Sequence, residues 1–274
     1  MSVDLVFVWA CLLAFAVLAY VILDGFDLGI GILFPFTRSD QERDLMMNTV
    51  APVWDGNETW LVLGGIGLFA VFPLAYSILL PALYAPLMAM LLALIFRGVA
   101  FEFRFRTRRW KRGWDLGFVV GSLVATFCQG IALGAFIQGV AVIGRTYAGG
   151  WFDWLTPFSV FVGIALVLGY AFLGATWLIL KTGGAIQERF YRLAMPSGAA
   201  LLVSIAVVSL WTPLLDADIA ARWFSWPNIA YVAPVPLLVS ALAAGIYWTL
   251  RRRKEGWRFR WRWACSCFLT SAWA

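Results

Sequence analysis

Residues 5–34 read LVFVWACLLAFAVLAYVILDGFDLGIGILF, and they place this protein in a membrane. Residues 5–23 carry no charge, and about 20 apolar residues are enough for an α-helix to cross a bilayer. The same apolar stretch continues through Asp24 and Asp27. An ionised carboxylate inside a bilayer costs at least about 2.5 kcal/mol, so an acid at that depth is a candidate for function.

The composition agrees with a membrane protein built from helices. The chain is 62% hydrophobic and 13% charged, whereas a soluble domain has about 25% charged residues. The period-2 alternation of a membrane β-barrel is absent. The net charge of +6 reflects basic residues at the ends of the spans, which is a topology signal and not a nucleic-acid signal. The predicted class is an all-α, polytopic membrane bundle.

The uncharged stretches predict about seven transmembrane helices in a domain spanning residues 1–250. After the first span, a second starts near Asn48 and a third ends near Phe103, with a turn bracketed by Pro73 and Pro81. The further stretches are 116–144, 154–180, 193–215 and 223–250. Short connections favour an up-and-down arrangement.

The distribution of Lys and Arg predicts the orientation. Eighteen of the 21 basic residues lie in the connections that follow spans one, three, five and seven, namely 38–44, 104–112, 181–192 and 251–262. The opposite connections hold only Arg145 and Arg222. Cytoplasmic connections are rich in Lys and Arg, so the N-terminus is expected outside and residues 104–112 in the cytoplasm.

A second pair of acids, Asp55 and Glu58, lies in APVWDGNETWLVLGG (51–65). Each pair is three residues apart, a spacing that places both acids on one helix face. The first two spans share a short connection, so we expect antiparallel neighbours whose four acids converge in the cytoplasmic half. Arg97 and Glu102, near the inner end of the third span, are the expected charge partners.

Two interpretations of these acids are open. They could hold and pass protons, or they could cap broken helices and pair with Arg97. The chain has no histidine, so any proton handling would use carboxylates, and any haem would take its ligands from another subunit. No catalytic or metal-binding residue is predicted on this chain.

Two tryptophans flank the second pair of acids. Trp54 is either an interfacial anchor or an aromatic wall for a quinone ring, and Trp60 stands at the other end of the same segment. In the fourth span, Gln129 and Gln138 are expected to form hydrogen bonds between helices.

Three motifs carry a specific resemblance to a known family. They resemble motifs of subunit II of the cytochrome bd quinol oxidases and read VILDGFDLGIGILFPF, NTVAPVWDGNETWLVLGG and IFRGVAFEFRFR. Their residues are especially similar to the cyanide-insensitive branch of that family. GSLVATFCQGIALGAFIQG and WLTPFSVFVGIALVLGYAFLGATWLILKT extend the resemblance over about residues 1–250.

The resemblance implies a complex of the bacterial cytoplasmic membrane that oxidises quinol and reduces dioxygen to water. All haems would lie on subunit I, and this chain would be its haem-free partner. The resemblance places Asp27 and Asp55 on a proton route and Trp60 near a lipid-side dioxygen entrance. It also implies lipid contacts, a structural quinone at the subunit interface, a small accessory single-span subunit and no nucleic-acid partner.

The end of the chain departs from the family pattern. The family has eight helices, and an eighth is expected after RRRKEG, where WRFRWRWACSCFLTSAWA stands instead. Residues 251–274 are interpreted as a truncated or frame-shifted tail outside the native family sequence, with an interfacial basic tail as the alternative.

Two further functions remain open on the residues alone. Paired acids in a membrane also fit a proton-coupled transporter, although such transporters usually contain repeats and none is visible here. The other possible function is that of a purely structural subunit needed for assembly of a complex.

Overall fold

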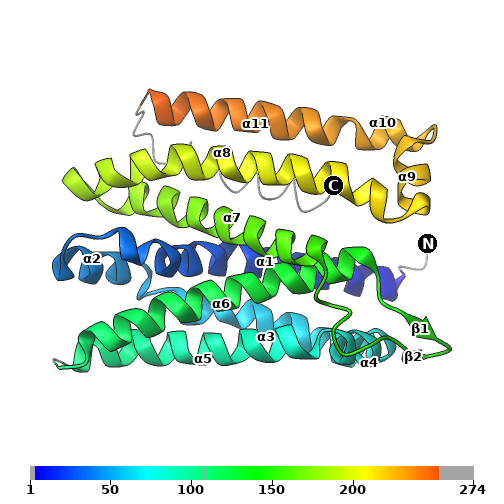
Figure 1. Cartoon of the computed structure of the whole chain (residues 1–274), viewed down its shortest axis with the longest axis horizontal. Helices are drawn as coiled ribbons and strands as arrows, with labels where there is room; N and C mark the ends of the chain where they lie inside the picture. The colour runs from blue at the N-terminus through cyan, green and yellow to red at the C-terminus, as the bar shows by residue number, and fades with distance from the viewer. Residues whose placement is uncertain (1–3, 108, 253–274) are drawn as a thin grey trace.

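The computed structural model describes residues 4–107 and 109–252, which form a bundle of helices lying side by side along one axis (Figure 1). The long helices are α1 (Leu5–Leu33), α3 (Trp54–Val71), α5 (Tyr84–Arg106), α6 (Lys111–Gln138), α7 (Pro157–Lys181), α8 (Gly184–Leu215) and α11 (Pro234–Arg251). The short elements are η1 (Phe34–Phe36), α2 (Asp40–Val50), α4 (Pro73–Ala82), α9 (Ala217–Phe224), α10 (Asn228–Val232) and the hairpin β1 (Val142–Ile143) and β2 (Thr146–Tyr147).

The all-α membrane class is confirmed. Within the described residues, six helical segments are long and apolar enough to cross a membrane: Leu5–Phe36, Tyr84–Arg106, Lys111–Gln138, Pro157–Lys181, Gly184–Leu215 and Asn228–Arg251. The predicted second span corresponds to α3, whose first turns carry Asp55, Asn57 and Glu58. The expected eighth helix and the tail interpretation concern residues that lie outside the described ranges.

The segment between Pro73 and Pro81 is not the turn that we expected. It forms the ten-residue helix α4, which begins at Pro73 and contains Pro81. Proline lacks an N–H but is tolerated in the first turn of a helix, where that group has no partner within the helix. The backbone leaves helical geometry at Phe72 and Leu83, which flank α4.

Local capping explains where two of the long helices begin. The carboxylate of Asp4 accepts hydrogen bonds from the N–H groups of Val6 and Phe7 at the start of α1. At α7, the side chains of Thr156 and Ser159 form a reciprocal capping box. These bonds satisfy N–H groups that have no partner within the helix.

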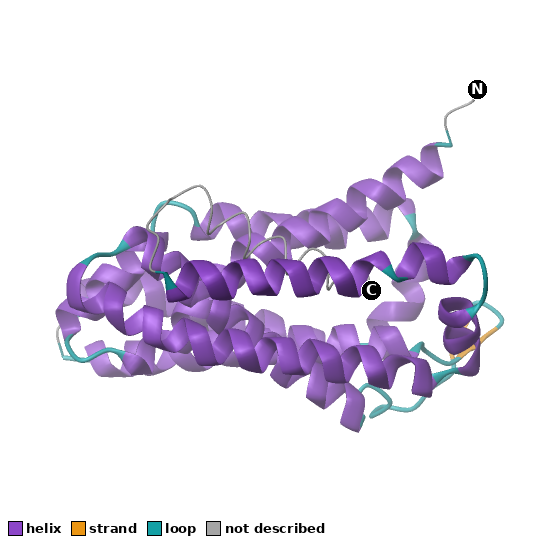
Figure 2. Cartoon of the chain, turned by 90° about the horizontal axis from the view of Figure 1, so that it is seen from above, coloured by secondary structure: helices purple, strands orange, loops and turns teal. Residues whose placement is uncertain are grey.

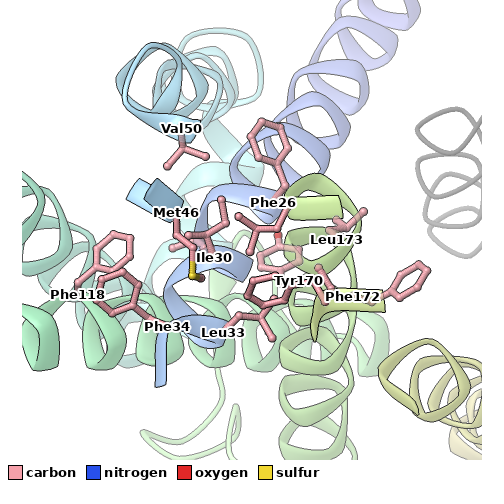
Figure 3. Packing of buried hydrophobic residues seen from close by; sticks show 14 of the residues in the cluster. Phe26, Ile30, Leu33, Phe34, Met46, Val50, Phe118, Tyr170, Phe172 and Leu173 are labelled. Carbon is pink, nitrogen blue, oxygen red and sulfur yellow. The ribbon is translucent and has the colours of Figure 1, made fainter. Parts of the chain in front are cut away.

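The core surrounds the C-terminal half of α1. Phe26, Ile30 and Leu33 of α1 pack with Met46 of α2 and with Leu173 of α7 (Figure 3). The N-terminal half of α1 is largely exposed, and in Figure 2 the helix diverges from the bundle toward the N-terminus. The buried acids therefore lie on the half of α1 that neighbouring helices enclose.

Glycine permits the close contact between α1 and α7. A Cβ added to Gly29 would overlap the backbone carbonyl of Tyr170, and one added to Gly174 would overlap the backbone of Gly29. Small residues let helix backbones approach closely in membranes. This contact packs the face of α1 that carries Gly25 and Gly29 against α7.

Candidate functional site

The centre of the candidate site is Arg97 of α5, whose side chain is fully buried. Its Nη1 lies 2.5 Å from Oε1 of Glu58 on α3 and 3.7 Å from Oδ1 of Asp24 on α1. The guanidinium also lies 5.9 Å from the ring centroids of Trp54 and Phe118. One buried cation therefore joins three helices that are far apart in the sequence.

Asp27 is held by a second polar contact between α1 and α3. The Nδ2 group of Asn57 donates to Oδ2 of Asp27 at 2.7 Å and to the Leu23 carbonyl at 3.3 Å. Asp24 and Asp27 both have zero exposed surface in the chain. Asn57 was not singled out in the sequence, although a polar residue between two acids in an apolar helix was an available signal.

The charges of this cluster do not balance when every group is ionised. Asp24 and Glu58 lie 3.7 and 2.5 Å from the guanidinium of Arg97, and Asp27 follows Asp24 by about one turn on the same side of α1. An uncompensated charge away from water is costly, and a carboxyl group avoids that cost by taking a proton. The arrangement can therefore store a proton, and Glu58, whose side chain is 25% exposed, is its most accessible member.

Two tyrosines and a glutamine extend the polar interior next to Asp24. The Nε2 group of Gln129 on α6 donates to the hydroxyl of Tyr20 at 2.6 Å, and the hydroxyl of Tyr170 on α7 donates to Gln129 Oε1 at 2.8 Å. The expected interhelical role of Gln129 is confirmed. Gln138 accepts from the hydroxyl of Thr156 at 2.5 Å, at the start of α7.

The structure brings together four of the six charged residues predicted for the site: Asp24, Asp27, Glu58 and Arg97. Asp55 is exposed, although it lies within electrostatic range of Glu58. Glu102 is exposed on α5 and lies outside this cluster. Three of the four predicted acids thus converge, and Asp55 faces out of the chain.

The two predicted tryptophans have different surroundings. Trp54 packs inside the chain against Arg97, and its ring centroid lies 5.2 Å from that of Phe101. Trp60 meets Phe15 of α1 edge to face at 5.8 Å. Trp54 therefore belongs to the wall around the buried cation, whereas Trp60 lies where α3 meets the N-terminal half of α1.

A second ion-pair network, not foreseen from the sequence, lies near the connection between α5 and α6. Arg104 is buried and pairs with Asp44 of α2 and Asp115 of α6. Arg43 lies 3.0 Å from Asp115, and Lys111 lies 3.1 Å from Asp44. Partial burial opposes ionisation of Asp44, but hydrogen bonds from Arg104 and Lys111 outweigh it and lower the pKa of this carboxyl.

Among the described residues, potential metal ligands do not gather into a site. Within residues 4–107 and 109–252, no three Cys, Asp or Glu side chains are arranged to hold a metal ion. Cys11 and Cys128 are free thiols, the first exposed and the second buried. The chemistry that the described site supports is ion pairing, hydrogen bonding and proton storage.

Comparison with known sequences finds one family. The sequence model described as "Cytochrome bd terminal oxidase subunit II" matches residues 5–274. "Cytochrome bd-I ubiquinol oxidase subunit 2" of Escherichia coli K12 is 34% identical over 213 residues, which are 75% of this chain and 56% of that protein. "Cytochrome bd ubiquinol oxidase subunit 2" of Bacillus subtilis is 29% identical over 255 residues, covering 92% and 74% of the two chains. This chain thus spans just over half the length of the E. coli relative.

The fold also matches a solved structure. A chain in "The structure of bd oxidase from Geobacillus thermodenitrificans" superposes with a TM-score of 0.75 at 20% identity. The match covers 98% of the present chain and 83% of the other. This structural similarity confirms the helical-bundle fold of the chain.

Proposed function

Because this chain belongs to the cytochrome bd terminal oxidase subunit II family, we propose that it is the haem-free subunit of a quinol oxidase in the bacterial cytoplasmic membrane. The complex would oxidise quinol and reduce dioxygen to water. The family match over residues 5–274 and the six apolar spans in the described part of the chain support this proposal.

The composition and packing of this chain support placing the haems on another subunit. Histidine is absent from the sequence, and Met46, Met47 and Met90 are packed within the apolar core. Haem iron takes axial ligands from His, Met, Cys or Tyr; of these, histidine is absent from the sequence and the three methionines named above are buried. We therefore assign the haems to subunit I.

We propose that the exposed start of α3 contacts subunit I. Asp55 is exposed, and a Cβ added to Gly56 would meet nothing within 4 Å. A carboxylate facing hydrocarbon costs about 2.5 kcal/mol or more, so contact with lipid alone would be unfavourable. A protein partner that hydrogen-bonds Asp55 would remove this cost.

The buried cluster around Arg97 carries the proposal that subunit II delivers protons. Three carboxylates share one buried guanidinium, so a proton can be stored there. Glu58 lies between the buried acids and Asp55, with which it interacts electrostatically. The route would run from Asp24 and Asp27 through Glu58 to Asp55 and into subunit I.

Trp60 supports a separate proposal for dioxygen. Its ring packs on Phe15 where α1 diverges from the bundle, on a surface rich in exposed apolar side chains. Dioxygen is apolar and dissolves well in lipid, so an entrance at this surface is chemically reasonable. A structural quinone, lipids and an accessory single-span subunit are further proposed partners, with no contact residues assigned.

The test of proton delivery is Glu58→Gln in the complete oxidase, with Glu102→Gln as the matched control. General acid–base groups contribute about 10²–10⁴-fold to rates, so quinol-driven oxygen consumption should fall by at least about tenfold in Glu58→Gln. The control, an exposed acid outside the cluster, should retain the wild-type rate. Haem content per complex monitors assembly.

Two results would reject the proposed role. Wild-type turnover in Glu58→Gln at normal haem content would show that this acid passes no protons. Loss of haem in that variant would favour a purely structural subunit. A proton-coupled transporter would instead show substrate-driven proton uptake without a haem-binding partner.

A further inference from the structure

Basic side chains around the connection between α5 and α6 belong to two sets with different surroundings. The first set consists of Arg104 and Lys111, which belong to the ion-pair network described above. Arg104 pairs with Asp44 and Asp115, and Lys111 pairs with Asp44. These two cations therefore already have carboxylate partners, and their role is to hold α2, α5 and α6 together.

The second set consists of Arg106, Arg109 and Arg112, which we call the basic face. All three are exposed, and none of them takes part in an ion pair among the described residues. Glu102, one turn before Arg106 on α5, is also exposed and forms no ion pair within that part of the chain. The positive charges of the basic face are thus available to an anion from outside the chain.

The basic face lies where a membrane presents its headgroups. Both α5 and α6 are long and apolar enough to cross a bilayer, and the basic face spans the junction of their ends, at one tip of the bundle (Figure 1). Three aromatic side chains accompany it, and Phe103, Phe105 and Trp110 are 49%, 49% and 72% exposed. Tryptophan favours the membrane–water interface. The cations can therefore reach lipid phosphates while the rings enter the same leaflet.

The start of α6 adds to the attraction for an anion. This helix begins at Lys111 with no acidic residue in its first turn and no side chain that caps it. The N-terminal end of a helix carries partial positive charge, and Lys111 and Arg112 increase the positive charge there. A phosphate group next to the basic face would offset this unfavourable concentration of charge.

We propose that the basic face binds the phosphate groups of anionic phospholipids in the adjoining leaflet. The guanidinium of arginine offers paired N–H donors that match phosphate oxygens. A soluble anion would make no use of Phe103, Phe105 and Trp110, so a lipid fits this surface better. The proposal assigns contact residues and a charge to the lipid partner. It goes beyond proton delivery, because it depends only on the membrane location of the chain.

The test measures local enrichment of an anionic lipid around the complete oxidase in phosphatidylcholine vesicles. In a cysteine-free background, a fluorophore is attached at Gly113→Cys, an exposed position beside the basic face. Its quenching is compared for phosphatidylglycerol and phosphatidylcholine that carry the same nitroxide near the headgroup. Each basic residue near an anionic surface contributes about fivefold to binding. Half-maximal quenching should therefore need an at least about fivefold lower fraction of phosphatidylglycerol than of phosphatidylcholine.

Two triple variants isolate the basic face. Replacement of its three arginines by glutamine should make the two lipids quench equally, whereas replacement by lysine keeps the charge and should retain most of the preference. The matched control removes three exposed cations from the connection before α2, from α8 and from the end of α11, namely Arg38→Gln, Arg192→Gln and Arg251→Gln. It should preserve the preference, and haem content per complex monitors assembly in every variant.

If the glutamine triple variant fails to assemble, the single variants decide. Arg106→Gln, Arg109→Gln and Arg112→Gln should each lower the preference by up to about fivefold. Inorganic phosphate added at constant ionic strength should leave the preference intact, and its loss would identify a site for free phosphate instead of lipid.

Four further outcomes would overturn the proposal. These are equal quenching by both lipids in the wild type, an unchanged preference in the glutamine triple variant, an equal loss in the matched control, and the absence of quenching by either lipid. The last result would show that a protein segment of the complex covers the basic face. Wild-type turnover in Glu58→Gln would reject proton delivery without affecting lipid quenching, so failures of the two proposals are distinguishable.

Discussion

Glu58 of α3 and Arg97 of α5 form an ion pair inside the bundle, with 2.5 Å between Oε1 and Nη1. The guanidinium is fully buried, whereas the carboxylate side chain keeps 25% of its surface exposed. The pair thus links a buried cation to the edge of the chain, and Asp24 approaches the same nitrogen from α1.

Replacement of Arg97 should strongly destabilise the subunit. Arg97→Leu leaves Asp24, Asp27 and Glu58 without their shared cation, and breaking a buried pair in this way costs about 3–5 kcal/mol. We expect a lower melting temperature and reduced haem content of the complex. Arg109→Leu, at an exposed position, should match the wild type, and equal stability of the two variants would show that Arg97 does not compensate the acids.

Asp55→Asn should leave assembly largely intact and slow turnover or alter its pH dependence. Asn keeps the shape of the side chain and can still hydrogen-bond subunit I, but it carries no titrating proton. Oxygen consumption measured across the pH range, normalised to haem, checks this expectation. An unchanged pH–rate profile would exclude Asp55 from the proton route.

The pair of Glu42 and Arg189 joins α2 to α8, with two bonds at 2.5 and 3.0 Å. Hydrogen bonding to Arg189 lowers the pKa of Glu42. A carboxyl whose pKa is lower in the folded state stabilises the protein above its unfolded pKa of about 4.3, and this contribution disappears as the pH falls through the folded value.

Glu42→Gln should therefore lower stability at neutral pH by about 1 kcal/mol or less, because the pair is partly exposed. Thermal unfolding should show this difference at neutral pH and little difference in strong acid. Glu102→Gln serves as the control. A deficit of Glu42→Gln that persists unchanged below the folded pKa would exclude the ion pair as its cause.

Gly29→Ala should disrupt the contact between α1 and α7, because its methyl group would overlap the backbone carbonyl of Tyr170. Overpacking typically costs about 1–3 kcal/mol, and a backbone neighbour cannot rotate away. Gly65→Ala is the control, because its Cβ would meet nothing within 4 Å. The melting temperature should fall only in Gly29→Ala, and equal values would show that the helices can separate slightly.

The orientation predicted from the basic residues can be tested by cysteine labelling of intact cells. In a cysteine-free background, a membrane-impermeant maleimide should label Arg145→Cys and leave Arg109→Cys unlabelled until the membrane is opened. The reverse pattern would invert the topology. A reporter fused after Ala274 should report the cytoplasmic side.

The membrane class, the long helices and the candidate acids could be predicted from the sequence because they depend on local properties. Hydropathy decides whether a segment can cross a bilayer, and acidic residues inside an apolar stretch can be found by inspection of the sequence. The resemblance to the oxidase family likewise rests on continuous motifs, and the family match confirms it.

The rotation of each helix about its axis depends on packing with the other helices, and only the tertiary structure decided it. Residues three apart on a helix are offset by about 60°, so Asp55 can face outward while Glu58 turns toward Arg97. The same rotation brings Asn57 to Asp27. Gln129 meets Tyr20 only because small residues let α1, α6 and α7 pack closely. Such contacts join residues distant in the chain, and no local pattern encodes them.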